Sequence, residues 1–463
     1  MFRMKRITAL FCAVMLHTAL LTGCGVEPIF TESRGEESVT GTTTQPSADT
    51  DQTSADTTDG QTVPGSTTVT EPGTETAPGT TANPGSTTPQ QSTVTTATRG
   101  GGGASTGTKT SRSTDAQSST ETAATEPIYV TKDLQALVDS MTLQQKAAQM
   151  MLVGIVDEPT ARQAAADGVG ALCLFAKPFK NKTKAQVRTM TASFQSKASI
   201  PLIISADEEG GTINRISINS KLRAVPFWLG RDLYAQGGWD LVISDTKEKA
   251  ELLLDLGVNV NLAPVADVPL SSGNYIYNRC FSLNAEETAE YIRTVVTEMK
   301  QDGLGSTLKH FPGYGGSVDT HKSMGYDDRN YSAFENGDLL PFIAGIEAGA
   351  DAVMVSHNIV RCMDADNPAS LSKNVHDLLR NTLGFQGVII SDDLGMGAIT
   401  QFTGGTNPAV AAVLAGNDLV AYSDYKTSVA AIVAAVEDGK IPESQINASV
   451  MRILKWKQSL GLI

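Results

Sequence analysis

The chain has 463 residues but only 5 cysteines, 6% aromatic residues and fewer basic than acidic side chains. Two cysteines lie in the first 24 residues, and the others are an odd number with wide spacing, so the fold does not depend on a disulfide framework. The sequence also allows a disulfide bridge between Cys280 and Cys362. Lysine and arginine total 36 against 50 acids, and the net charge of −14 leaves no general basic surface. We therefore expect no nucleic acid partner.

Residues 25–127 contain almost no aromatic or branched apolar side chains and consist largely of Thr, Ser, Gly and Pro. Such a segment cannot bury enough apolar surface to offset the entropy lost on folding. We expect a disordered linker, whose r.m.s. span as a flexible coil of about 100 residues is roughly 55 Å. This length suits a domain that reaches into or through a cell wall, and a plain spacer or a glycosylated stalk would have the same composition.

The first 24 residues begin with basic side chains and continue with an apolar run from Ile7 to Leu21, which ends in Leu21-Thr22-Gly23-Cys24. The run is short for a membrane span of about 20 residues. The arrangement resembles a bacterial lipoprotein signal peptide, which implies that Cys24 is acylated and becomes the first mature residue. An ordinary cleaved signal or an uncleaved anchor is the alternative. We expect the protein at the extracellular face of the bacterial cell membrane, held in the lipid bilayer through Cys24.

Residues 128–463 are long enough to bury one large hydrophobic core. Short apolar runs alternate there with helical patterns. The runs are Met150–Ile155, Val169–Phe175, Pro201–Ala206, Val258–Val265, Ser306–Phe311, Ala352–Ser356, Val388–Ser391 and Leu419–Tyr422. The helical patterns include Ala285–Gln301, Gly337–Ala348, Val375–Leu383 and Glu443–Ser459. Eight such units predict an α/β fold, a (β/α)8 TIM-type barrel forming a single catalytic domain, with a doubly wound open sheet as the alternative.

Polar side chains follow five of the expected strands at their C-terminal ends, where barrel enzymes place their active sites. These side chains are Asp207, Asp267, Lys309 with His310, His357, and Asp392 with Asp393. A doubly wound sheet would concentrate its ligands at one switch point, so this distribution favours the barrel.

Three of the 5 histidines, His310, His321 and His357, lie at or just beyond strand ends. Three imidazoles on one face of a barrel indicate a functional site more strongly than any one of them alone. His376 lies within an expected helix and is interpreted as a solvated surface residue.

Three motifs carry a family resemblance: Lys309-His310-Phe311-Pro312-Gly313, then Asp319-Thr320-His321, then Ser391-Asp392-Asp393-Leu394. In this order they resemble glycoside hydrolase family 3, and within it the β-N-acetylglucosaminidase branch. Segments that support the resemblance are Asp207–Gly211 with Arg215, Ala263–Asp267 and Arg279–Phe281. The resemblance covers roughly residues 130–463.

The resemblance implies a retaining β-N-acetylglucosaminidase that acts on terminal β-linked N-acetylglucosamine in peptidoglycan fragments or related glycosides. We expect no cofactor, no metal and a monomer. Asp392 matches the family's nucleophile, which forms a covalent glycosyl intermediate. A helix cap is the alternative role for Asp392 or Asp393. Asp319 and His321 match the acid/base pair of this branch, in which the carboxylate orients the imidazole and favours its charged form.

Substrate holding is implied for Asp207, Arg215, Arg279, Lys309 and His310, which would grip the sugar beside the scissile bond. Asp267 and His357 are expected to lie behind these groups. The loop before His321 is rich in glycine, so we expect it to be mobile and to bring His321 in when sugar binds. The chain departs from the family where Tyr314 replaces a usual histidine, where the loop to Asp319 is one residue shorter, and where Cys280 replaces a usual serine.

Other functions fit parts of the pattern. A β-N-acetylglucosaminide phosphorylase or a β-glucosidase of the same family would use similar groups. A metal-dependent hydrolase could use the three histidines with an aspartate, although the chain has no close His-x-His or His-Glu-x-x-His spacing. A non-catalytic wall-binding lipoprotein would be expected to lack the nucleophile or the acid, and both are present.

Overall fold

The computed structural model describes residues 133–463. The expected signal peptide over 1–24, the acylated Cys24 and the linker over 25–127 lie outside the described residues. Among residues 133–463, no helix is both long enough and apolar enough to cross a membrane.

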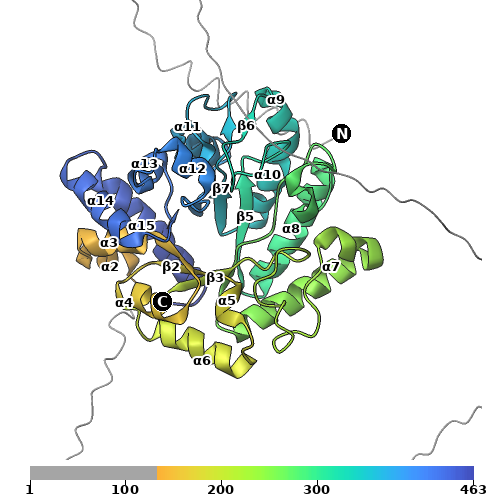
Figure 1. Ribbon diagram of the computed structural model, residues 1–463, viewed down its shortest axis with the longest axis horizontal. Coiled ribbons are helices and arrows are strands. Elements are labelled where there is room, and N and C mark those ends of the chain that lie inside the picture. The colour runs from red at the N-terminus through yellow and green to blue at the C-terminus, as the bar shows by residue number, and fades with distance from the viewer. Residues whose placement is uncertain (1–132) are drawn as a thin grey trace, which may run out of the picture. The chain divides into compact units, whose positions relative to one another are not determined.

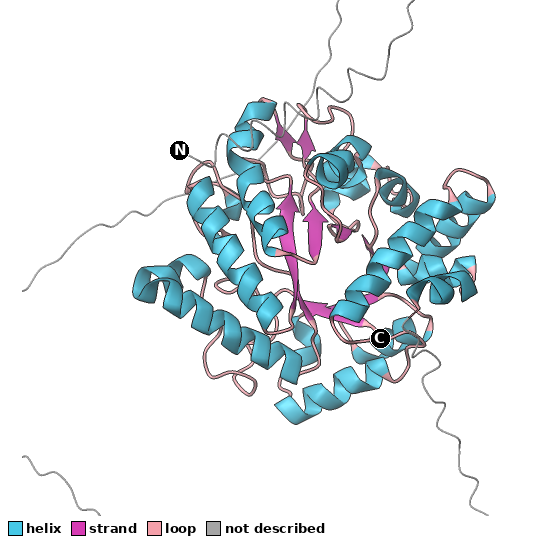
Figure 2. Cartoon of the chain, turned by 180° about the vertical axis from the view of Figure 1, so that it is seen from behind, coloured by secondary structure: helices cyan, strands magenta, loops and turns pink. Residues whose placement is uncertain are grey.

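The described residues form a barrel of parallel strands surrounded by helices (Figures 1 and 2). The strands follow the order β10-β1-β2-β3-β4-β5-β7-β9, and a parallel bridge between Ile390 and Leu419 links the two ends of this series. They are β1 (Met151–Ile155), β2 (Ala171–Leu174), β3 (Ile203–Ala206), β4 (Val260–Asn261), β5 (Gly305–Phe311), β7 (Ala352–Val355), β9 (Val388–Ser391) and β10 (Val420–Ala421). The predicted (β/α)8 barrel is confirmed, and the doubly wound sheet is not observed.

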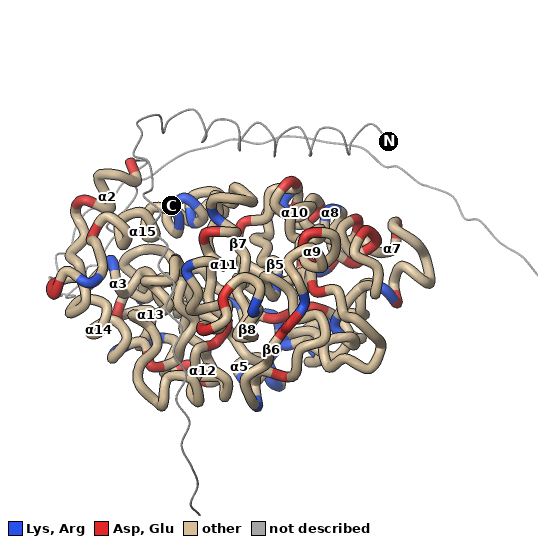
Figure 3. Tube along the Cα trace, turned by 90° about the horizontal axis from the view of Figure 1, so that it is seen from above, with Lys and Arg blue, Asp and Glu red and all other residues tan. Residues whose placement is uncertain are grey.

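Helices connect the strands and cover the outside of the barrel (Figure 1). The α-helices are α2 (Leu134–Ser140), α3 (Leu143–Gln149), α4 (Glu158–Ala166), α5 (Ala176–Phe179), α6 (Lys184–Gln195), α7 (Gly230–Asp255), α8 (Ala285–Gln301), α9 (Tyr331–Ala333), α10 (Leu339–Ala348), α11 (Lys373–Asp377), α12 (Gly397–Phe402), α13 (Ala409–Ala415), α14 (Tyr425–Glu437) and α15 (Glu443–Ser459). Short 3₁₀ and π turns are η1 (Tyr275–Arg279), η2 (Phe334–Asp338), η3 (Ala369–Leu371) and η4 (Leu378–Thr382). Basic and acidic side chains are interspersed along the described chain in the view of Figure 3.

Local sequence explains where the helices begin. Asn284 caps α8 by accepting hydrogen bonds from the backbone N–H groups of Glu286 and Glu287, and α8 has the bounds expected from the sequence. The helix expected over Gly337–Ala348 is α10 preceded by the π turn η2, and the one over Val375–Leu383 is α11 continued by η4.

The strands are buried on both faces, as parallel strands covered by helices must be. Every residue of β2, β3, β7 and β9 is buried. A second, two-stranded sheet that the sequence did not suggest pairs β6 (Tyr326–Asp327) with β8 (Ile359–Val360). It joins the loop after β5 to the loop after β7, and so lies beside the segment that carries His321.

The interpretation of His376 as a solvated surface residue is wrong. Its side chain is buried, its Nδ1 lies 2.7 Å from the carbonyl oxygen of Ser372, and burial lowers its pKa. His376 packs against Gly416, which follows α13, so a tertiary contact covers a position that the helical pattern alone leaves open.

The bridge between Cys280 and Cys362 is also absent, because Cys173, Cys280 and Cys362 are all free.

Candidate active site

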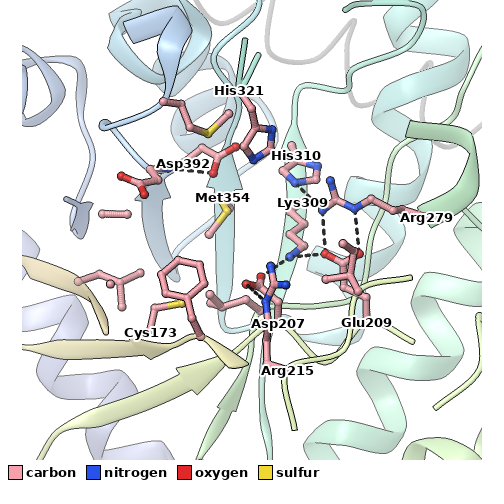
Figure 4. A pocket seen from close by; sticks show the side chains of 18 of the residues that line it. Cys173, Asp207, Glu209, Arg215, Arg279, Lys309, His310, His321, Met354 and Asp392 are labelled. Carbon is pink, nitrogen blue, oxygen red and sulfur yellow. Dashed lines mark hydrogen bonds and ion pairs between the residues drawn. The ribbon is translucent and has the colours of Figure 1, made fainter. Parts of the chain in front are cut away.

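A cavity of about 240 Å³ opens at the C-terminal ends of the barrel strands (Figure 4). Seven of the expected site residues line it: Asp207, Arg215, Arg279, Lys309, His310, His321 and Asp392. The eighth, Asp319, lies behind His321 and contacts its imidazole. Apolar and aromatic side chains complete the wall, among them Cys173, Phe175, Tyr275, Met354 and Tyr422. The structure therefore brings all the expected groups to one place.

A cluster of opposite charges forms one side of the cavity. Lys309, which is buried on β5, places its Nζ 2.8 Å from Asp207 Oδ1 and 2.6 Å from Glu209 Oε1. Arg279 donates to Glu209 through Nη2 at 2.7 Å and through Nε at 2.9 Å. Burial opposes the ionisation of Glu209, but the Arg279 and Lys309 charges hold its pKa well below the usual range. Asp207 also faces Arg215, whose Nε lies 3.5 Å from its Oδ2.

Glu209 is the site residue that the sequence argument missed. It lies in the acidic segment after β3, and the sequence does not distinguish it from the adjacent Glu208. Glu208 turns away from the cavity and accepts hydrogen bonds from the backbone N–H groups of Arg215, Ile216 and Ser217. It fixes the loop that presents Arg215, whereas Glu209 balances the two buried cations.

Replacement of Glu209 by glutamine should destabilise the fold, because it leaves Lys309 and Arg279 together and buried without their shared anion. We expect the free energy of unfolding to fall by about 3 kcal/mol or more. Urea denaturation followed by tryptophan fluorescence measures this change. The matched control is Glu248→Gln, which breaks the more exposed pair with Arg223 and should cost less than about 1 kcal/mol. Equal losses in the two variants would contradict the central role given to Glu209.

His310 is held in one orientation by its neighbours. Its Nδ1 lies 2.7 Å from Asp267 Oδ2, and its Nε2 lies 3.2 Å from Arg279 Nη2. Because a guanidinium can only donate, Nε2 is the acceptor and Nδ1–H donates to Asp267. Asp267 Oδ2 also accepts the backbone N–H of His310, and Oδ1 accepts that of Tyr314. Asp267 therefore lies behind the cavity wall and orients the groups in front of it, as expected.

Asp392 stands at the end of β9 with its carboxylate in the cavity. Its own N–H donates to the carbonyl oxygen of Val355, and its Oδ1 accepts from the N–H of Asp393 at 2.9 Å. Burial opposes the ionisation of Asp392, but nearby His357 and the hydrogen bond from the Asp393 N–H lower its pKa. Asp392 is therefore an anion over the whole neutral range.

Asp393 and His357 support the turn that follows the nucleophile candidate. Asp393 Oδ1 accepts from the N–H of Gly395, and the carbonyl oxygen of Asp393 lies 2.9 Å from His357 Nε2. Burial and the charge of Asp392 raise the pKa of Asp393. The two neighbouring carboxyl groups thus have pKa values shifted in opposite directions, downward for Asp392 and upward for Asp393.

His321 and Asp319 form a pair on the loop between β5 and β6. His321 Nδ1 lies 2.8 Å from Asp319 Oδ1, which also accepts the backbone N–H of His321 at 3.2 Å. Burial opposes the ionisation of Asp319, but its hydrogen bonds to His321 lower its pKa. Figure 4 shows His321 beside Asp392 at the same end of the cavity. An imidazole with a carboxylate behind it and an anion in front of it has the geometry of an acid/base group facing a nucleophile.

Metal ligation is the other chemistry that the three histidines suggested. In residues 133–463, no group of three or more His, Cys, Asp or Glu side chains is arranged to hold a metal ion. His310 and His321 are bonded to separate aspartates, and His357 to Ser370 and a backbone carbonyl.

Comparison with known proteins gives consistent results. The family model described as "Glycosyl hydrolase family 3 N terminal domain" matches residues 142–456. A β-hexosaminidase of Xanthomonas oryzae pv. oryzae is 34% identical over 282 residues, which cover 58% of this chain and 82% of that protein. A glycoside hydrolase family 3 β-N-acetylglucosaminidase from a Paenibacillus species has a TM-score of 0.66 and 33% identity, over 70% of this chain and 63% of that one. A β-N-acetylhexosaminidase from Beutenbergia cavernae has a TM-score of 0.61 and 27% identity, over 69% and 99% of the two chains.

Proposed function

Because the chain belongs to glycosyl hydrolase family 3 and is a glycoside hydrolase of the β-hexosaminidase type, we propose that it releases terminal β-linked N-acetylglucosamine with retention of configuration. Its substrates would be peptidoglycan fragments or related glycosides. The observation that carries the proposal is the placement of ionised Asp392 and the Asp319–His321 pair at one end of one cavity.

In the first step of the proposed mechanism, Asp392 attacks the anomeric carbon and forms a covalent glycosyl ester. His321 donates its proton to the departing glycosidic oxygen, and Asp319 stabilises the charged imidazole from behind. In the second step, the neutral imidazole takes a proton from water, and the hydroxide equivalent displaces Asp392. The two displacements each invert the anomeric carbon, so the configuration is retained.

In the proposed function, the charge cluster on the side of the cavity binds the sugar. Asp207 can accept from sugar hydroxyls, while Lys309, Arg279 and Arg215 donate. Lys309 and Arg279 are fixed by Glu209, and His310 is fixed by Asp267, so the two donors and the imidazole beside them are ordered before substrate arrives. Preorganised donors bind substrate without a further cost of ordering side chains.

Replacement of Asp319 by asparagine should shift the pH profile. The carboxylate, whose pKa is lowered by its hydrogen bonds to His321, stabilises the charged form of the pair, and the asparagine amide would not. We expect the alkaline limb of kcat/KM for a disaccharide substrate to move to lower pH and the value at neutral pH to fall by about tenfold or more. Asp328→Asn, at an exposed carboxylate outside the cavity, is the control. An alkaline limb that stays in place would contradict the pairing.

The proposed function is tested by comparing aryl β-N-acetylglucosaminide with aryl β-glucoside, each with and without inorganic phosphate. We expect turnover of the N-acetylglucosaminide, free N-acetylglucosamine as product and no acceleration by phosphate. Preference for the glucoside would indicate a β-glucosidase, and sugar phosphate as product would indicate a phosphorylase. Either outcome would overturn the proposal.

The place of action is a proposal from the sequence. Acylation of Cys24 would hold the protein at the extracellular face of the cell membrane, and the linker over 25–127 would let the barrel reach wall fragments. The expected monomeric state also stays a prediction.

A further inference from the structure

We infer that Tyr314 and Thr320 position the acid/base pair, and that the hydrogen bond between their hydroxyl groups holds His321 over the nucleophile. The inference rests on the proposed function, because it gives His321 the role of proton donor. Tyr314 and Thr320 are therefore positioning residues rather than catalytic ones.

Thr320 separates Asp319 from His321 in the chain and differs from both in its surroundings. Thr320 is fully buried, whereas the side chain of His321 is 63% exposed and that of Asp319 is 25% exposed. The contact between Asp319 and His321 fixes the two side chains relative to each other but does not fix the pair relative to the barrel. The buried residue between them attaches the loop to the rest of the domain, and a second contact follows at Lys322, whose carbonyl oxygen accepts from Gln401 Nε2.

Two contacts hold Thr320 from opposite directions. Its carbonyl oxygen accepts from the N–H of Ala398 at 3.2 Å, and its Oγ1 lies 2.6 Å from the hydroxyl oxygen of Tyr314. Ala398 belongs to α12, the helix that follows the turn after Asp392. The approach to α12 is close, because a Cβ at Gly397 would lie only 2.8 Å from the carbonyl oxygen of His321. The loop with the acid/base pair is therefore docked on the segment that carries the nucleophile.

Tyr314 is itself rigidly placed. Its ring is buried and meets Tyr275 edge to face at a centroid distance of 5.3 Å and His310 at 5.0 Å. Its N–H donates to Asp267 at 2.8 Å, the same carboxylate that holds His310. A continuous series of contacts thus runs from His310, in the wall of the cavity, through Asp267 and Tyr314 to Thr320.

This arrangement predicts which step depends on Tyr314. Without the hydroxyl bond, the loop keeps its contact with Ala398 but loses its side-chain link to the end of β5. His321 would then spend less time in the geometry that protonates the leaving group. Substrates whose leaving groups depart without a proton would be unaffected in their first step, because Asp392 is untouched.

The test compares Tyr314→Phe, Thr320→Val and the double variant with the wild type. We expect kcat/KM for the N-acetylglucosamine disaccharide to fall about tenfold in each single variant, through loss of one buried hydrogen bond. The double variant should fall no further, because both changes remove the same bond. With 2,4-dinitrophenyl β-N-acetylglucosaminide, kcat/KM should stay within about twofold of wild type, since that leaving group needs no proton. Tyr331→Phe, at a more exposed tyrosine on α9, is the matched control.

Amide hydrogen exchange of residues 319–323 supplies a readout that does not depend on the reaction. It should accelerate in Tyr314→Phe and in Thr320→Val but not in Tyr331→Phe. Equal losses on both substrates, additive losses in the double variant or unchanged exchange would overturn the inference. If the wild type released no N-acetylglucosamine, the proposed function would fail, and the exchange data would still decide whether the hydroxyl bond holds the loop.

Discussion

Asp392→Ala should abolish turnover of every glycoside, with a loss of roughly 10⁴-fold or more in kcat, as expected when a covalent nucleophile is removed. The effect is independent of the leaving group, because no substrate can form the glycosyl ester without this carboxylate. Asp392 is suited to the role because it is ionised, faces the cavity and is fixed by the Asp393 N–H. Initial rates on a disaccharide and on an activated aryl glycoside measure the effect.

The control for this prediction is Asp377→Ala, which removes an exposed aspartate on α11 and should leave both rates unchanged. Circular dichroism and the midpoint of urea unfolding establish that Asp392→Ala is folded. Substantial residual activity in a folded Asp392→Ala protein would show that another group is the nucleophile.

His321→Ala should produce the second-largest effect, and the effect should depend on the leaving group. We expect kcat/KM for the disaccharide to fall by about 10²- to 10⁴-fold, the usual contribution of a general acid. For 2,4-dinitrophenyl β-N-acetylglucosaminide, kcat/KM should change little, because that leaving group departs without a proton. Plotting log kcat/KM against the pKa of a series of phenol leaving groups should give a steeper slope for the variant than for the wild type.

Ser323→Ala is the control for this series, since Ser323 is an exposed residue of the same loop. It should follow the wild-type slope. If His321→Ala lowered kcat/KM by the same factor for every leaving group, the histidine would serve binding or loop structure and not proton transfer.

The barrel could be predicted from the sequence because its strands are buried on both faces. Runs such as Ala352–Val355 and Val388–Ile390 are apolar throughout, and the second leads through Ser391 to Asp392, which enters the cavity. Helices with strong local signals were also predictable, such as α8, which begins after the cap Asn284. The order of the motifs along the chain also indicated which residues form the site, and seven of these residues line one cavity.

Features that depend on tertiary contacts could not be predicted. Glu208 and Glu209 are neighbours of the same type, and only the backbone turn after β3 directs one to the loop and the other to the cations. The burial of His376 depends on Gly416, a residue 40 positions away in the sequence. The sheet of β6 and β8 has two residues in each strand, too few for a periodic pattern.

The contact made by Tyr314 also depends on the folded structure and could not be predicted from the sequence. The sequence marks Tyr314 only as a departure from the histidine that the family usually has at this position. The structure shows that its hydroxyl group reaches Thr320, between the two members of the acid/base pair. The expectation that the loop is mobile stays a prediction, and the structure describes it docked on α12.

The central claim, a covalent intermediate on Asp392, is tested most directly in the His321→Ala variant. With a dinitrophenyl substrate this variant should form the glycosyl ester normally but hydrolyse it slowly, because the group that activates water is absent. Acid quenching during turnover, followed by proteolysis and mass spectrometry, should therefore reveal one N-acetylglucosaminyl unit on the peptide that contains Asp392. The same adduct should be missing when Asp392→Ala is added. No adduct at any time, or an adduct on a different residue, would contradict the mechanism.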